Sequence, residues 1–145
     1  MARLRVAIDI ARPAREVWRY LEQIERHPEW MRDCVDITFE GGQRRGPGTR
    51  FVARTRVLGI ELDDLMEVVT WRPRRSMAVR HRGIVWGSGE FRLRRRGRSH
   101  TRFSWAERLH FPWWLGGPLG AWAAVPVLRL IWKGSLRALR EKLES

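Results

Sequence analysis

The sequence predicts a single α+β domain, in which about seven strands are followed by one long C-terminal helix. Residues 35–110 alternate between apolar and polar side chains with a period of two, which is typical of antiparallel strands. After residue 126 the apolar side chains recur every three or four residues, which indicates an amphipathic helix. The 145 residues suit one domain, and no repeat or linker divides them, so we assign residues 1–145 to a single domain.

The chain opens with a strand followed by two short helices. Residues 4–10 alternate between apolar and polar side chains, as a half-buried strand does. Pro13 suits the first turn of a helix, and an apolar stripe at helical spacing extends over residues 17–24. Pro28 ends this helix, and residues 29–31 are predicted to form a further short helical turn.

Turns that contain glycine divide the middle of the chain into six strands. The strands are predicted at residues 35–39, 50–57, 60–71, 76–81, 87–94 and 101–109. Most of them carry arginines at one set of alternating positions and apolar side chains at the other. Because arginine is rarely buried without a partner, we expect the basic face of this meander to point to solvent and the apolar face to point inward.

The facing of residues 60–71 stays open at the level of sequence. If Glu61 and Asp63 point outward and pair with arginines of a neighbouring strand, then Asp64 points inward. The opposite facing, which puts Trp71 inside, fits the pattern nearly as well. A β-bulge within the strand would change which positions share a face.

The C-terminal third combines an uncharged stretch with an amphipathic helix. Residues 111–128 carry no charge, contain Trp113, Trp114 and Trp122, and are interrupted by prolines and glycines. After Pro126 the apolar side chains keep helical spacing, and the charged side chains lie on the opposite side. We therefore predict that a long helix follows Pro126.

This order of elements, together with several short segments, resembles the START-like (SRPBCC) superfamily and, within it, the polyketide cyclase/dehydrase and lipid-transport group. The segments that carry the resemblance are 8–21 (IDIARPAREVWRYL), 27–31 (HPEWM), 46–51 (GPGTRF), 69–73 (VTWRP), 89–93 (GEFRL) and 101–107 (TRFSWAE). They extend over nearly the whole chain. Because they mark turns, strand registers and core contacts, they identify a fold rather than a ligand or a reaction.

The resemblance implies a helix-grip fold, in which the curved antiparallel sheet wraps around the long C-terminal helix and leaves a cavity between them. It also implies binding of a small hydrophobic molecule such as a lipid, a sterol or a polyketide. Some members of the superfamily catalyse cyclisation or dehydration. Without the resemblance a solid core would be the better expectation, because protein interiors are close-packed.

Side-chain parity predicts which residues would line such a cavity. The predicted ligand-binding residues are Phe51, Thr55, Met66, Val79, His81, Phe91, Phe103, Trp105, Glu107 and Trp122. A lining that is mostly apolar with few polar groups is typical of small-molecule pockets.

Three titratable residues are candidates for chemistry in the cavity: Glu107, His81 and Asp64. Parity places Glu107 beside Trp105 on the apolar face, where a carboxylate is costly unless it is paired. It would serve as a general acid or base, or anchor a ligand hydroxyl, and His81 on the same face would be its partner. Alternatively, Glu107 pairs with an arginine at the rim, and His81 is a satisfied core residue.

The composition limits cofactors, compartment and partners. The four histidines lack metal-ligand spacing, and the sequence has no phosphate-binding glycine loop, so we predict no metal and no cofactor. The lone Cys34 and the absence of a long apolar N-terminal run predict a cytoplasmic protein. The formal net charge of +13 comes almost entirely from arginine, which reflects either a GC-rich genome or a surface that binds anions.

Two partners would use this charge. A transient contact of residues 111–128 with an anionic membrane surface is one hypothesis, because tryptophans and flanking arginines are typical of interfacial segments. The alternative is that these residues only close the cavity and begin the helix. Nucleic-acid binding ranks last, because exposed aromatic residues are not interleaved with the basic runs.

The sequence therefore favours binding or transport of a small hydrophobic ligand. The alternative is a cyclase or dehydratase that uses a cavity carboxylate. It ranks below ligand binding because the inner face supplies few polar residues for catalysis.

Overall fold

A computed structural model describes residues 2–145, and these form one seven-stranded sheet with two α-helices and two short 3-10 helices. The strands are β1 (Ala2–Ile10), β2 (Cys34–Glu40), β3 (Arg50–Val57), β4 (Ile60–Arg72), β5 (Ser76–Arg82), β6 (Trp86–Arg95) and β7 (Thr101–His110). The helices are α1 (Ala14–Leu21), η1 (Ile24–Glu29), η2 (Trp113–Leu115) and α2 (Gly117–Glu144). The predicted fold class is confirmed.

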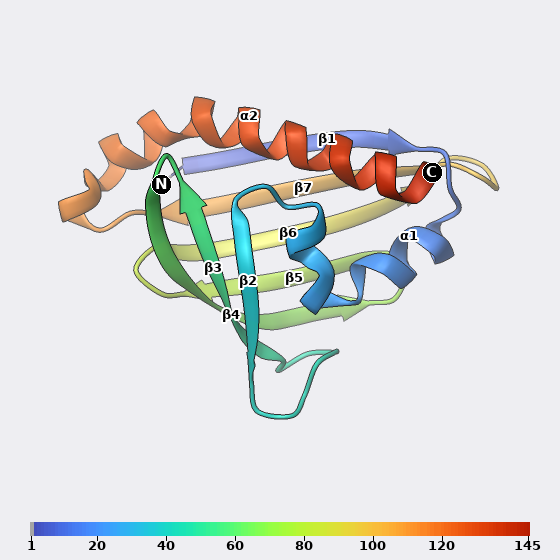
Figure 1. Ribbon diagram of the computed structural model, residues 1–145, viewed down its shortest axis with the longest axis horizontal. Coiled ribbons are helices and arrows are strands. Elements are labelled where there is room, and N and C mark those ends of the chain that lie inside the picture. Colours follow the sequence, from blue (N-terminus) through green and yellow to red (C-terminus); the bar gives the residue numbers. More distant parts are fainter. Residues whose placement is uncertain (1) are drawn as a thin grey trace.

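The sheet is antiparallel throughout, with the strand order β1-β7-β6-β5-β4-β3-β2. Strands β2 to β7 form a meander, and β1 pairs with β7 at one edge. In Figure 1, β2 and β3 run at a steep angle to β1 and β7, so the sheet is strongly curved. The long helix α2 packs against β1 and β7. The curved sheet therefore bends toward the side on which the helix lies.

Strand β4 settles the facing that the sequence left open. Asp64 pairs with Ala53 and Met66 pairs with Phe51, so both point to the inner face. The register then shifts between Val68 and Thr70, which is the mark of a β-bulge. After the bulge Trp71 also lies on the inner side, where its ring meets Trp18 with the centroids 5.3 Å apart. Each of the two facings thus holds for one part of the strand.

The outer face of β3 and β4 carries ion pairs between neighbouring strands. Arg54 lies 3.3 Å from Asp63, and Arg56 lies 3.2 Å from Glu61. These pairs are exposed, so each contributes less than about 1 kcal/mol to stability. Glu61 and Asp63 thus pair on the face of β4 opposite to that of Asp64.

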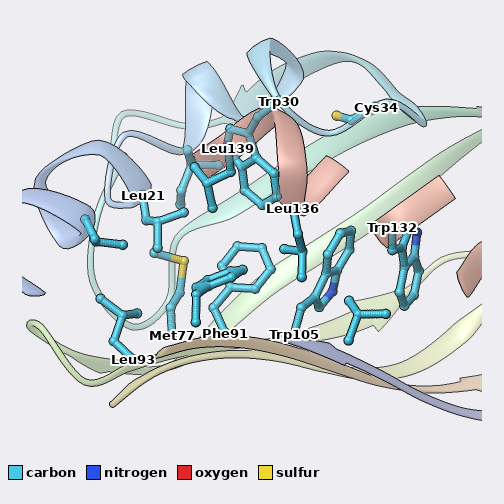
Figure 2. Packing of buried hydrophobic residues seen from close by; sticks show 14 of the residues in the cluster. Leu21, Trp30, Cys34, Met77, Phe91, Leu93, Trp105, Trp132, Leu136 and Leu139 are labelled. Carbon is cyan, nitrogen blue, oxygen red and sulfur yellow. The ribbon is translucent and has the colours of Figure 1, made fainter. Parts of the chain in front are cut away.

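An aromatic cluster fills the space beneath the C-terminal half of α2. Trp30 is 1% exposed, and its ring lies 5.7 Å from that of Phe91 and 6.1 Å from that of Phe103. Figure 2 shows Leu136 and Leu139 of α2 against this cluster. Aromatic side chains therefore pack closely at this end, and the largest apolar lining lies toward the N-terminal half of α2.

The long helix begins earlier than the sequence pattern predicted. It starts at Gly117, and Pro126 lies inside it rather than before it. Gly116 has a φ of +93° and ends η2, and Pro118 lies in the first turn of α2, where the missing N–H has no helical partner in any case. Within residues 2–145, no helix combines the length and the apolar character needed to cross a bilayer.

Candidate functional site

A cavity of about 420 Å³ lies between the inner face of the sheet and the N-terminal half of α2. This volume falls within the range of about 300–1,000 Å³ that small-molecule pockets span. Eight of the residues predicted to bind ligand line it, and so does the catalytic candidate Asp64. These eight are Phe51, Thr55, Met66, Val79, His81, Phe91, Trp105 and Glu107.

Two predicted ligand-binding residues lie elsewhere, and these predictions are corrected. Phe103 is fully buried in the aromatic cluster, with its ring 5.3 Å from that of Phe91. Trp122 is 75% exposed. Because α2 already has helical geometry here, Gly120 and Ala124 face the cavity, and Trp122 between them points to solvent.

One wall of the cavity brings the three titratable candidates together. The Nδ1 atom of His81 lies 3.0 Å from both carboxylate oxygens of Asp64, and Nε2 lies 2.7 Å from Oε2 of Glu107. These residues come from β5, β4 and β7, so the curved sheet assembles the group from three strands. Glu107 also accepts a hydrogen bond from the indole of Trp105, with Nε1 3.0 Å from Oε1. Glu107 thus pairs with histidine rather than with an arginine at the rim.

A glycine on β6 lets this group form, because β6 lies between β5 and β7. Gly89 pairs with Val79 on one side and with Glu107 on the other. A Cβ atom at position 89 would lie 2.5 Å from both carboxylate oxygens of Glu107. The missing side chain therefore leaves the space through which Glu107 reaches across β6 to His81.

The surroundings of His81 favour its charged form. Burial lowers the pKa of the imidazole, but the charge of Glu107 and the hydrogen bonds with Asp64 and Glu107 outweigh burial and raise the pKa to about 10. His81 is therefore an imidazolium at neutral pH, and each ring N–H donates to a carboxylate. The result is a cation held between two anions at the cavity wall.

A third carboxylate, Asp33, joins the site and was not predicted. It is 8% exposed, and its Oδ2 accepts a hydrogen bond of 2.9 Å from the indole of Trp132 on α2. Trp132 lies beside Trp105 (Figure 2). The two rings are stacked, with their centroids 4.2 Å apart and their planes 13° from parallel. Trp132 is one of the apolar side chains at helical spacing after Pro126, and Asp33 stands outside any periodic segment, so no sequence signal marked either one as a site residue.

The pKa of Asp33 is raised above its ordinary value, mainly by burial and also by the charges of Glu107 and Asp64. The hydrogen bond from Trp132 opposes this shift. Asp33 therefore feels the negative charge of the His81 group. Over residues 2–145 no group of three or more His, Cys, Asp or Glu side chains is arranged to hold a metal ion.

Comparison with known proteins decides the family. A sequence model described as polyketide cyclase / dehydrase and lipid transport matches residues 1–145. The chain belongs to this polyketide cyclase/dehydrase and lipid-transport family. The resemblance inferred from the sequence is thereby confirmed. No curated protein sequence matches the chain.

Several solved structures share the fold of this polyketide cyclase/dehydrase family member at low sequence identity. A START superfamily protein from Mycobacterium smegmatis has a TM-score of 0.78 at 11% identity and covers 99% of this chain and 98% of its own. The Zhui aromatase/cyclase from Streptomyces sp. R1128 has a TM-score of 0.80 at 18% identity, with coverages of 98% and 93%. The di-domain ARO/CYC BexL has a TM-score of 0.73 at 13% identity, and the match covers half of that chain. At these identities the likeness establishes the fold alone.

Proposed function

We propose that the protein binds or transports a small hydrophobic molecule, such as a lipid, a polyketide or an aromatic compound, in the internal cavity. The observation that carries this proposal is a cavity of about 420 Å³ whose lining is mostly apolar. Burial of apolar ligand surface there would supply the main driving force. The hydrogen-bonded group of His81, Asp64 and Glu107 lies at one wall of the cavity, so it would orient the polar end of the ligand.

Filling the cavity tests this function. Val79 lines the cavity and lies opposite Gly89, whereas its neighbour Ala78 points to the other face of β5. We expect Val79→Trp to weaken binding of dodecanol by about tenfold or more, and Ala78→Trp to leave it unchanged. Isothermal titration calorimetry measures the affinity, and circular dichroism checks that both variants fold. Equal binding by a folded Val79→Trp would exclude the cavity as the site.

A second candidate function is catalysis of the cyclase or dehydratase kind. It is favoured by an imidazolium and two carboxylates at a cavity wall, since such groups carry protons in general acid–base chemistry. It ranks second because both N–H groups of His81 already donate to carboxylates, and a pKa of about 10 lies far from neutral pH. Loss of turnover of a polyketide substrate in Glu107→Gln, with binding retained, would favour this candidate over transport.

We also propose a transient contact between residues 111–128 and an anionic membrane surface. Trp113 and Trp122 are 86% and 75% exposed, while Leu115 and Ala123 of the same segment line the cavity. A segment that faces both solvent and cavity is suited to deliver a hydrophobic ligand to a bilayer. The net charge of +13 adds an attraction to anionic lipid.

Vesicle binding measures this contact. We expect the protein to bind phosphatidylcholine vesicles that contain phosphatidylglycerol more tightly than pure phosphatidylcholine vesicles, and high salt to reduce the difference. The triple variant Trp113→Ser, Trp114→Ser, Trp122→Ser should lower vesicle binding by roughly tenfold. Val69→Ser removes an apolar side chain that is 46% exposed on the sheet and should leave binding unchanged. Equal loss in both variants would contradict a role for residues 111–128.

A further inference from the structure

The charge inside the cavity has the opposite sign to the charge of the whole molecule. Asp33, Asp64 and Glu107 all line the cavity, whereas no arginine or lysine of residues 2–145 contributes to the lining. The whole chain has a formal net charge of +13. The many arginines therefore lie on the outside, where Arg54 and Arg56 pair with acidic residues of the outer face.

Five acidic residues border the cavity, and two of them, Asp63 and Glu90, pair with Arg54 and Arg92. The other three carboxylates, Asp33, Asp64 and Glu107, share one cation. His81 uses one ring nitrogen for Asp64 and the other for Glu107. The side-chain partner of Asp33 is the neutral indole of Trp132, and within residues 2–145 no positively charged side chain pairs with this carboxylate. Charges in an apolar, water-poor environment are screened weakly, so this excess of negative charge favours any positive group that enters.

Two stacked indoles connect the carboxylates. Trp105 donates to Glu107, and Trp132 donates to Asp33, so the two tryptophans extend from one end of the acidic set to the other. Both rings line the cavity. The faces of indoles attract cations, and the attraction is greater when water is excluded. The carboxylates and the indoles thus favour the same kind of ligand group.

We propose that the hydrophobic ligand of this cavity carries a protonated amine, which lies among Asp33, Asp64 and Glu107 and beside the Trp105–Trp132 pair. This inference rests on the proposed function, because it names the polar end of the molecule that the cavity binds. Charge-assisted hydrogen bonds from an ammonium to these carboxylates would be stronger than those from a hydroxyl. A carboxylate ligand would be repelled, although the basic outer surface attracts anions.

Three probes with the same apolar tail separate these cases: dodecylamine, dodecanol and dodecanoate. We expect calorimetry at pH 7 to give dodecylamine an affinity about tenfold or more above that of dodecanol, and dodecanoate the weakest binding. In Val79→Trp the new side chain fills the cavity, so any binding that this variant retains is binding to the outer surface and is subtracted. Two carboxylates of β4 supply the matched variants, because Asp64 lines the cavity, whereas Glu61 does not and pairs outside with Arg56.

Asp64→Asn should lower the preference for amine over alcohol by about fivefold or more, and Glu61→Gln should leave it unchanged. Asp33→Asn, which keeps an oxygen for the Trp132 indole, provides a second cavity variant and should also lower the preference. If dodecanoate binds in the cavity as tightly as dodecylamine, or if Asp64→Asn and Asp33→Asn both keep the preference, the inference is overturned while dodecanol binding still supports the proposed function. If none of the three probes binds, the proposed function and this inference both fall.

Discussion

His81→Leu is expected to lower the free energy of unfolding by about 3–5 kcal/mol at pH 7, because it leaves a buried charge group without its cation. Glu107 is 7% exposed, and without His81 its carboxylate would keep only the indole hydrogen bond of Trp105. Asp64 would lie near it with the same sign of charge. Chemical denaturation monitored by circular dichroism measures the difference.

The pH dependence of this effect follows from the raised pKa of His81. Because the folded-state pKa is about 10 and the ordinary value is 6.5, the contribution of His81 to stability is complete below pH 6.5 and is lost as the pH rises toward 10. The wild-type protein should therefore lose stability over this window, and the stability difference from His81→Leu should shrink.

Two further variants test the physical cause. His81→Leu combined with Glu107→Leu should recover most of the lost stability, because it removes the buried anion together with its cation. His100→Leu changes an exposed histidine between β6 and β7 and should alter stability by less than about 0.5 kcal/mol. A cost below about 1 kcal/mol for His81→Leu would contradict the buried ion group.

Trp30→Ala is expected to cost about 3–5 kcal/mol of unfolding free energy, as large aromatic truncations in a core do. Trp30 is 1% exposed, and its ring lies 6.0 Å from that of Trp105 and 5.6 Å from that of His27. No neighbouring element is free to collapse into the space, since Trp30 is enclosed between the sheet and α2.

The indole nitrogen of Trp30 sharpens this prediction. Within residues 2–145 this Nε1 atom has no hydrogen-bond partner, although it is buried. Trp30→Phe should therefore cost less than half as much as Trp30→Ala, because it keeps most of the ring contacts and removes an unsatisfied donor. Trp113→Ala, at a side chain that is 86% exposed, should stay within about 0.5 kcal/mol. Far-ultraviolet circular dichroism is the suitable signal, because these variants change the tryptophan fluorescence itself.

Most of the architecture follows from local patterns. Alternation with a period of two predicted every strand of the meander, because a sheet with one buried face requires it. The same parity predicted that Glu107 and His81 share the inner face, and both line the cavity. The arginines marked the outer face, since their burial without partners is costly.

Other features depend on residues that are distant in sequence and meet only in the folded chain. The bulge in β4 allows both Asp64 and Trp71 to face inward, and alternation along a single strand cannot reveal it. The helix α2 extends through Pro126, because tertiary packing against β1 outweighs the local preference of proline. That earlier start turns Trp122 outward.

The site itself belongs to the tertiary structure. His81 meets Glu107 only because Gly89 of the intervening strand leaves room for the carboxylate. Asp33 joins them only through Trp132 of the last helix, which lies far along the chain. A strand pattern specifies which face a side chain occupies, but the pairing register and the curvature of the sheet specify which side chains on that face come within hydrogen-bonding distance.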